Sequence, residues 1–226
     1  MRQSFVTFAY LMGFIFFTHS DAFAVNSNVN SEWQLLEKGN HQFVQDPKFQ
    51  KERPVLVKGQ NPNTVILCCS DSRVPPELIF NQGLGEIFVS RVAGQVVDDV
   101  VVDSIEYAVA TFDVSLVLVL GHSSCGAVDG ALKRLRKNRG VVDSPGKGHL
   151  NAVLIPIETA IVRSGINIYA KDSLKQATKA NVRYMADQLI SRSSMIREGV
   201  KNGRVKVIGA KYSLKTGKVK QLFVIE

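Results

Sequence analysis

Four short apolar runs, separated by stretches of helical character, constrain the fold of this chain more than any other feature. The runs cover residues 64–69, 86–92, 116–121 and 205–210. Short, nearly continuous apolar segments are typical of strands buried on both faces of a parallel sheet. Because parallel strands need crossover connections, the intervening helices predict an α/β fold.

The pattern around these runs completes the expected sheet. Helices are predicted over residues 98–111, 125–137, 151–163 and 173–199. A final strand over residues 219–225 follows a short turn, so it is expected to return antiparallel at the sheet edge. We therefore predict a mostly parallel central sheet of four strands plus an antiparallel edge strand, flanked by helices.

The segment before the first strand has a different character. Residues 31–45 predict a helix whose apolar positions are only partly periodic, which favours packing on another chain instead of its own core. Residues 46–63 contain three prolines and predict an extended arm. Without internal repeats, the simplest organisation is one domain over residues 25–226, whose N-terminal helical arm covers residues 25–63.

Residues 1–24 predict export from the cytoplasm. Arg2 precedes an uncharged run over residues 5–17, and Ala22-Phe23-Ala24 has the small-residue pattern of a cleavage site. The run of 13 residues is short for a hydrocarbon layer of about 30 Å. We expect cleavage after Ala24, giving a periplasmic or secreted protein with no stable membrane anchor. An uncleaved anchor is the alternative.

The chain contains three cysteines, and their positions favour a metal site. An odd number of thiols in an exported protein argues against a disulfide framework. Cys69 ends the first apolar run, while His122 and Cys125 follow the third. Because parallel strands end at the same edge of a sheet, these three side chains are expected to meet.

Two thiolates and one imidazole suit Zn²⁺, and three protein ligands leave a fourth position open, as in catalytic sites. A buried free cysteine or a core histidine is the ordinary alternative for any one of these residues alone. Neighbouring strand residues face opposite sides, so Cys68 is expected to be a core residue and not a ligand.

Two motifs resemble the metal motifs of the β-class carbonic anhydrases. They are CCSDSRVPPE at residues 68–77 and GHSSCGAV at residues 121–128, and residues 86–89 and 105–108 are also similar. The resemblance implies a lyase, carbonate dehydratase, that reversibly hydrates carbon dioxide to bicarbonate and a proton by zinc-bound hydroxide. It also implies one zinc per subunit, held by Cys69, His122 and Cys125.

The same resemblance assigns residues around the metal. Asp71 and Arg73 match a dyad in which the aspartate orients the zinc-bound water or hydroxide and the arginine holds the aspartate. In some members this aspartate binds zinc instead, which gives a closed, inactive state. Gln60 is similar to a glutamine of the branch whose site stays open, where it reaches the substrate across a dimer interface.

The implied substrate pocket is apolar. Phe88, Ala93 and Tyr107 match residues that line it, and Gly126 is expected to offer its backbone to the site. Together with the N-terminal arm, Gln60 predicts a homodimer or a dimer of dimers.

Composition leaves few competing functions. The net charge is +8, and a basic cluster lies at residues 133–139. Without interleaved aromatic residues this cluster favours a solvated helix face, and no nucleic-acid partner is expected. Hydrolysis of carbonyl sulfide or carbon disulfide on the same fold is the nearest enzymatic alternative. A non-catalytic zinc or thiol-redox protein is the other, and Asp71, Arg73 and Gln60 argue against it.

Overall fold

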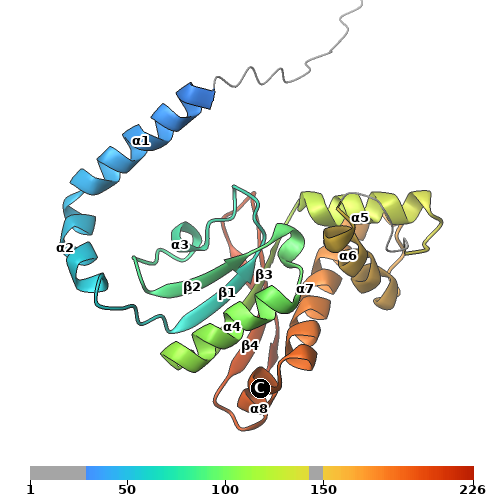
Figure 1. The fold of residues 1–226 in the computed structure, drawn as a ribbon. Coiled ribbons are helices and arrows are strands. Elements are labelled where there is room, and N and C mark those ends of the chain that lie inside the picture. Colours follow the sequence, from blue (N-terminus) through green and yellow to red (C-terminus); the bar gives the residue numbers. More distant parts are fainter. Residues whose placement is uncertain (1–28, 143–149) are drawn as a thin grey trace, which may run out of the picture. The chain divides into compact units, whose positions relative to one another are not determined.

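The computed structural model describes residues 29–142 and 150–226 (Figure 1). The chain divides into two units, residues 1–46 and 47–226. The predicted signal peptide, residues 1–24, lies outside the described residues. In the first unit, helix α1 (Val29–Gln45) forms where a helix is predicted. None of the described helices is long and apolar enough to cross a membrane.

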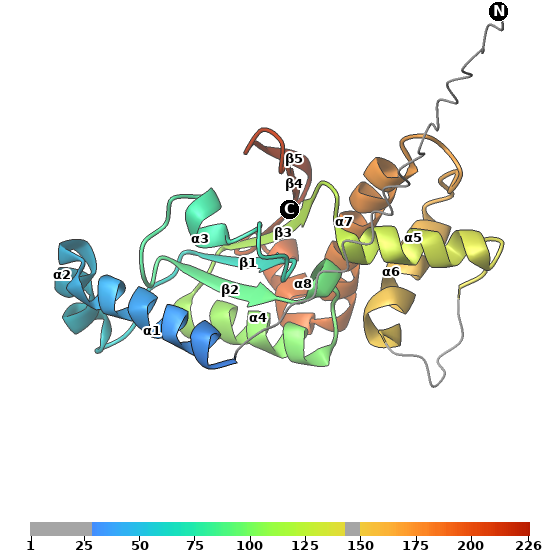
Figure 2. The same ribbon diagram turned by 90° about the horizontal axis from the view of Figure 1, so that it is seen from above.

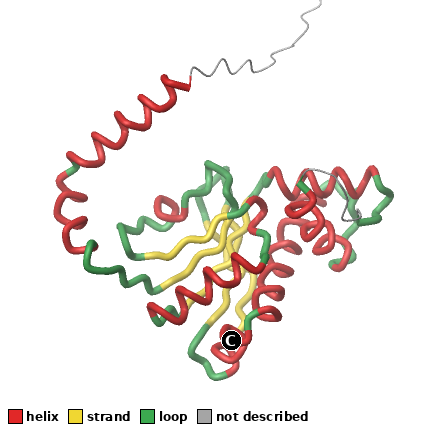
Figure 3. Tube along the Cα trace, viewed as in Figure 1, coloured by secondary structure: helices red, strands yellow, loops and turns green. Residues whose placement is uncertain are grey.

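The second unit is built on a sheet of five strands in the order β2-β1-β3-β4-β5. The strands are yellow in Figure 3. The strands are β1 (Thr64–Cys68), β2 (Ile87–Arg91), β3 (Leu116–His122), β4 (Lys206–Tyr212) and β5 (Val219–Ile225). The first four pair in parallel and β5 pairs antiparallel with β4. The predicted mostly parallel sheet with an antiparallel edge strand is therefore confirmed.

Helices cover one face of this sheet with the larger core (Figure 2). They are α4 (Asp99–Phe112), α7 (Ser173–Arg192) and α8 (Ser194–Lys201). Asp98 caps α4, because its carboxylate accepts a hydrogen bond of 2.8 Å from the Val101 amide. The opposite face has a smaller buried cluster that includes Ile66 and Cys68, near the short helix α3 (Pro76–Ile79).

Two further helices, α5 (Gly126–Lys137) and α6 (Asn151–Arg163), pack against each other. Arg134 of α5 forms an ion pair with the fully buried Glu158 of α6 and donates a hydrogen bond of 2.7 Å to Asn151. Arg136 donates 2.8 Å hydrogen bonds to the Ile168 carbonyl and the Ser173 hydroxyl. The expectation of a solvated basic face is wrong for these two arginines, which tie α5 to its neighbours.

The expected extended arm is also wrong for residues 47–56. These residues form α2 (Pro47–Leu56). Pro47 occupies the first helical position, where no amide hydrogen is needed, so it favours the helix it was expected to prevent. Pro54 lies within the helix near its end, where it removes only one backbone hydrogen bond.

The long helix expected over residues 173–199 is divided into α7 and α8. Ser193 leaves the helical conformation with φ −99° and ψ 112°, and its hydroxyl accepts a 2.9 Å hydrogen bond from the Ile196 amide. Serine favours such a cap because its side chain replaces a backbone acceptor at a helix start. The single turn η1 (Ala93–Gln95) was not predicted, although it lies beside the metal motif.

Candidate metal centre

The carboxyl ends of β1 and β3 bring the three predicted ligands together. Cys68 is level with Leu120 in the pairing of these strands, so Cys69, which follows β1, and His122, which ends β3, lie at the same end of the sheet. The ligand atoms of Cys69, His122 and Cys125 lie within 4.8 Å of one another, and the two sulfur atoms are 4.0 Å apart. All three residues are buried, as a preformed site requires.

The loop between His122 and Cys125 is held by the neighbouring strand. The Ser123 amide donates to the Tyr212 carbonyl at 2.9 Å, and the Ser123 hydroxyl accepts from the Leu214 amide at 3.0 Å. Ser124 adopts a left-handed conformation with φ 55°. That turn is uncommon for a residue with a side chain, and here it lets a strand end and a helix start supply ligands to one point.

The hydrogen bonding of His122 leaves one ring nitrogen for a metal. Nδ1 lies 3.0 Å from the Ser123 carbonyl oxygen, which can only accept, so Nδ1 carries the proton. Nε2 is buried and has no hydrogen-bond partner among the described residues. A histidine whose Nδ1 is fixed by a carbonyl and whose Nε2 lone pair faces two thiols fits a zinc ligand.

A hydrogen bond joins the sulfur atoms of Cys69 and Cys125. Hydrogen bonding with Cys125 lowers the pKa of the Cys69 thiol, and the same bond raises the pKa of Cys125. The amide of Gly94 also donates to the Cys69 sulfur at 3.2 Å. A bound dication would stabilise both sulfurs as thiolates.

The backbone of Gly94 is held in place by Asn181, a residue that the sequence analysis did not identify. The Asn181 side chain of α7 donates a 2.9 Å hydrogen bond to the Gly94 carbonyl. A Cβ at Gly94, where φ is 68°, would lie 2.6 Å from Ile157, so only glycine fits there. Asn181 lies 87 residues away in the sequence, and nothing local marks it as part of the site.

Asp71 and Arg73 lie beside the cluster as a bidentate pair. Arg73 Nε donates to Asp71 Oδ1 at 2.9 Å, and Arg73 Nη2 donates to Oδ2 at 2.7 Å. These bonds hold the pKa of Asp71 well below its ordinary value. Asp71 Oδ2 lies 3.9 Å from Nε2 of His122, so an ionised carboxylate faces the nitrogen that has no partner.

Arg91 holds the backbone of this loop. Its Nη2 donates to the Asp71 carbonyl at 2.7 Å, and its Nε donates to the Cys69 carbonyl at 3.2 Å. Arg91 is the last residue of β2, and a charge at the end of a mainly apolar strand is the sequence signal that could have indicated this role. Arg91 thus positions both a predicted ligand and the aspartate of the dyad.

Comparison with known proteins identifies the family. Residues 64–219 match the family model described as carbonic anhydrase. The chain is 38% identical over 201 residues to carbonic anhydrase 2 of Mycobacterium tuberculosis, covering 85% of this chain and 92% of the relative. It is 35% identical over 202 residues to a carbonic anhydrase of Mycolicibacterium smegmatis, covering 86% and 93% respectively.

Comparison with solved structures also points to the carbonic anhydrases. A crystal structure from a study of two tetrameric β-carbonic anhydrases of Sordaria macrospora has a TM-score of 0.68 and 28% identity. It covers 85% of this chain and 97% of that one. The chain belongs to the β-class carbonic anhydrases.

The five residues expected to form the substrate pocket of this carbonic anhydrase do not lie together. Ala93 begins η1 beside Gly94, and Gly126 begins α5 directly after Cys125, so both lie at the metal edge. Phe88 instead pairs with Val65, the second residue of β1. At about 3.3 Å per residue, Val65 is roughly 13 Å from Cys69 along the strand.

Gln60 and Tyr107 lie with Phe88, away from the metal edge. Gln60 precedes β1, and its Cβ would be 3.8 Å from a Cβ at Gly85, which precedes β2. The ring of Tyr107 is 6.1 Å from that of Phe88 and half exposed. These three side chains of the carbonic anhydrase therefore lie toward the amino ends of β1 and β2, away from the metal centre of the same chain.

Cys68 lies on the other face of the sheet from Cys69, in the smaller buried cluster with Ile66. Burial raises the pKa of its thiol to about 12. A thiol that stays protonated among apolar side chains is a core residue, as strand alternation predicts.

The ligand set of the carbonic anhydrase predicts a clear difference between the two adjacent cysteines. Cys69→Ala and His122→Ala should each lose bound zinc, because two remaining ligands do not hold the metal tightly. Cys68→Ala is the matched control, since its thiol faces away from the cluster. Metal analysis of purified protein should find one zinc per chain in the parent and in Cys68→Ala. Equal zinc content in all four proteins would exclude this ligand set.

Proposed function

We propose that this protein reversibly hydrates carbon dioxide to bicarbonate and a proton, with one Zn²⁺ per subunit held by Cys69, His122 and Cys125. Membership of the carbonic anhydrase family and the buried cluster of three ligands support the proposal. Bound zinc would supply the acidification of a water molecule, an effect for which carbonic anhydrases are the standard example. The observation that carries the proposal is the ionised Asp71, held by Arg73 at 3.9 Å from Nε2 of His122.

Asp71 is suited to orient the attacking water. Its carboxylate is ionised, so Oδ2 can accept a hydrogen bond and fix the direction of the water oxygen's lone pair. Arg73 keeps the carboxylate in place and prevents it from acting as a proton donor. The Arg73 guanidinium also lies 3.4 Å from the Ser124 carbonyl, so the dyad is anchored to the ligand loop.

The same pair supports an open metal position. In the closed state implied for some relatives, Asp71 would have to leave Arg73 to become a ligand. Both carboxylate oxygens are engaged by Arg73, with a third bond of 3.0 Å from the Arg73 amide to Oδ1. Breaking three charge-assisted or backbone hydrogen bonds disfavours closure, so we propose that the fourth position is free for water.

We further propose that the working enzyme is a homodimer, or a dimer of dimers, in which each site is completed by the neighbouring subunit. Gln60, Phe88 and Tyr107 lie toward the amino ends of β1 and β2, whereas the metal centre of the same chain lies at the carboxyl ends of β1 and β3. A two-fold arrangement brings the amino edge of one sheet to the metal edge of another in both directions. The Gln60 amide would then donate a hydrogen bond to a substrate oxygen, beside the apolar rings.

Residues 1–24 support a proposal on location. We propose that they direct export and are removed after Ala24, which places the enzyme in the periplasm or outside the cell. The mass of the protein recovered from an expressing cell's periplasm should correspond to a chain that begins at Val25.

Replacing the dyad should reduce hydration without removing zinc. Asp71→Asn keeps the shape but removes the charge, and should lower kcat/KM by at least about 100-fold in a stopped-flow hydration assay. Arg73→Lys, which loses the bidentate contact, should give a smaller loss than Arg73→Gln. Ser72→Ala, an exposed neighbour, is the control. A zinc-loaded Asp71→Asn enzyme with parental kcat/KM would contradict the assigned role.

Completion by the neighbouring subunit predicts complementation. Gln60→Ala and Asp71→Asn should each be weakly active as homodimers. In a mixed dimer, one site combines the intact Asp71 of one chain with the intact Gln60 of the other. Random co-assembly should therefore restore about a quarter of the parental sites. If both residues served the same chain's site, co-expression would restore nothing beyond the average of the two variants.

A further inference from the structure

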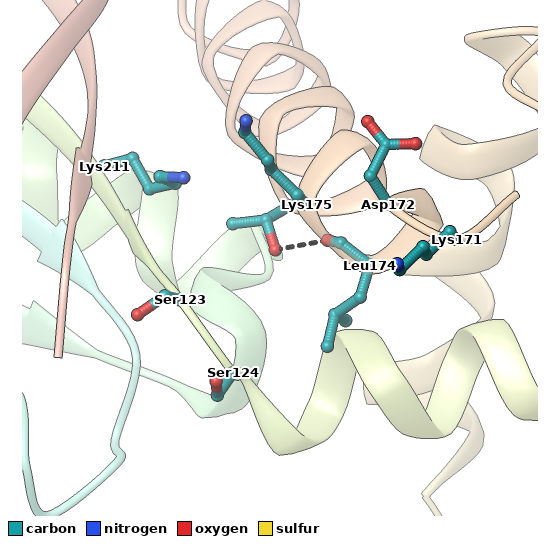
Figure 4. A pocket seen from close by; sticks show the side chains of 8 residues that line it. Ser123, Ser124, Lys171, Asp172, Leu174, Lys175 and Lys211 are labelled. Atoms are coloured by element: carbon teal, nitrogen blue, oxygen red, sulfur yellow. Dashed lines mark hydrogen bonds between the residues drawn. The ribbon is translucent and has the colours of Figure 1, made fainter. Parts of the chain in front are cut away.

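A hollow of about 320 Å³ lies beside the ligand loop, between the start of α7 and strand β4 (Figure 4). Its lining includes three lysines, two serines and one carboxylate: Lys171, Lys175, Lys211, Ser123, Ser124 and Asp172. Ser123 and Ser124 are the two residues between His122 and Cys125, so the hollow shares a wall with the metal centre without containing it.

The lysines around this hollow are arranged against one another. Lys211 of β4 lies directly opposite Lys220 of β5 in the strand pairing, where like charges are destabilising. Lys175 and Lys179 are four residues apart on α7, which places two further positive charges on one helix face. None of these four lysines, nor Lys171, forms an ion pair with a residue of the described chain.

The positive charges of neighbouring lysines act on Lys211. Partial burial lowers the pKa of Lys211, and the charges of Lys175, Lys179 and Lys220 lower it further. The one carboxylate of the lining, Asp172, accepts a 2.7 Å hydrogen bond from the Gln176 side chain. The fold therefore maintains a repulsive cationic cluster that its own acidic residues do not neutralise.

Neutral hydrogen-bond donors complete the lining. The Ser123 hydroxyl accepts a hydrogen bond from the Leu214 amide, which leaves its own hydrogen free to be donated. Ser124, two residues before the start of α5, adds a second hydroxyl to the lining. Hydroxyls and ammonium groups around one hollow match a ligand with several acceptor oxygens and more than one negative charge.

We propose that this hollow is a binding site for a small phosphate-class anion, such as orthophosphate or pyrophosphate. Such an anion carries roughly two or more negative charges at neutral pH and has several strong acceptor oxygens. Chloride and bicarbonate each carry only one negative charge. The hollow is concave and lies between the start of α7, strand β4 and the ligand loop, which favours a free anion over a lipid headgroup held at a flat membrane surface. The proposal does not depend on the hydration activity.

Calorimetric titration of the zinc-loaded protein at low ionic strength tests the site. Orthophosphate and pyrophosphate should bind saturably, pyrophosphate more tightly, with one pocket site per chain. Lys175→Gln/Lys211→Gln should weaken that binding at least about tenfold. The control Lys137→Gln/Lys201→Gln removes the same charge from exposed helix ends elsewhere, and should change binding by less than about twofold.

A thermal readout separates this role from a structural one. Because the lysines repel one another in the free protein, Lys175→Gln/Lys211→Gln should melt at a higher temperature than the parent when phosphate is absent. Because the same lysines bind the anion, the variant should lose most of the increase in melting temperature that pyrophosphate gives the parent. Lys171→Gln/Lys175→Gln, whose side chains are both exposed, provides a second variant of the same lining.

Four results would overturn the proposal. They are no saturable binding to the parent, unchanged affinity in both pocket variants, equal competition by chloride at matched ionic strength, and binding to phosphatidic acid vesicles without binding of the free anions. Unchanged affinity in the pocket variants would show that the anion binds outside this hollow.

Discussion

Parallel pairing of β1 with β3 is the contact on which the rest of this site depends. It sets Cys69 and His122 at one edge of the sheet although 53 residues separate them in sequence. Because the side chain direction alternates along a strand, the same register sends Cys68 into the opposite core. A shift of one residue would exchange the two cysteines, so the apolar packing of both sheet faces also selects the metal ligand.

Electrostatics then divides the work among neighbouring groups. The two thiols and Nε2 of His122 form a cluster of soft donor atoms that suits a zinc ion. Asp71 would add a third negative charge to that cluster if it became a ligand, and in the proposed open state Arg73 opposes this by binding both carboxylate oxygens. The backbone of this loop is in turn held by Arg91, so two arginines fix the position of one aspartate beside the cluster.

Much of this arrangement could be predicted from the sequence, for identifiable reasons. Buried parallel strands have continuous apolar runs, and residues at their carboxyl ends must meet, so the cluster of Cys69, His122 and Cys125 follows from local patterns.

Asn181 could not be predicted, because its contact with Gly94 depends on how α7 lies on the sheet. The cationic hollow could not be predicted for the same reason, since Lys175 and Lys211 are far apart in the sequence and come together only in the folded chain. The sequence instead drew attention to residues 133–139, where two arginines bind neighbouring elements. Proline content misled at residues 47–56, because a proline at a helix start does not oppose the helix.

The central claim is that the described cluster is a working zinc centre for carbon dioxide hydration. The most direct measurement is stopped-flow hydration by the metal-stripped protein before and after one equivalent of zinc is restored. We predict negligible activity without metal and, with zinc, a kcat/KM of about 10⁴–10⁸ M⁻¹s⁻¹, the range of ordinary to diffusion-limited enzymes. A folded, zinc-loaded protein that hydrates carbon dioxide no faster than buffer would contradict the account.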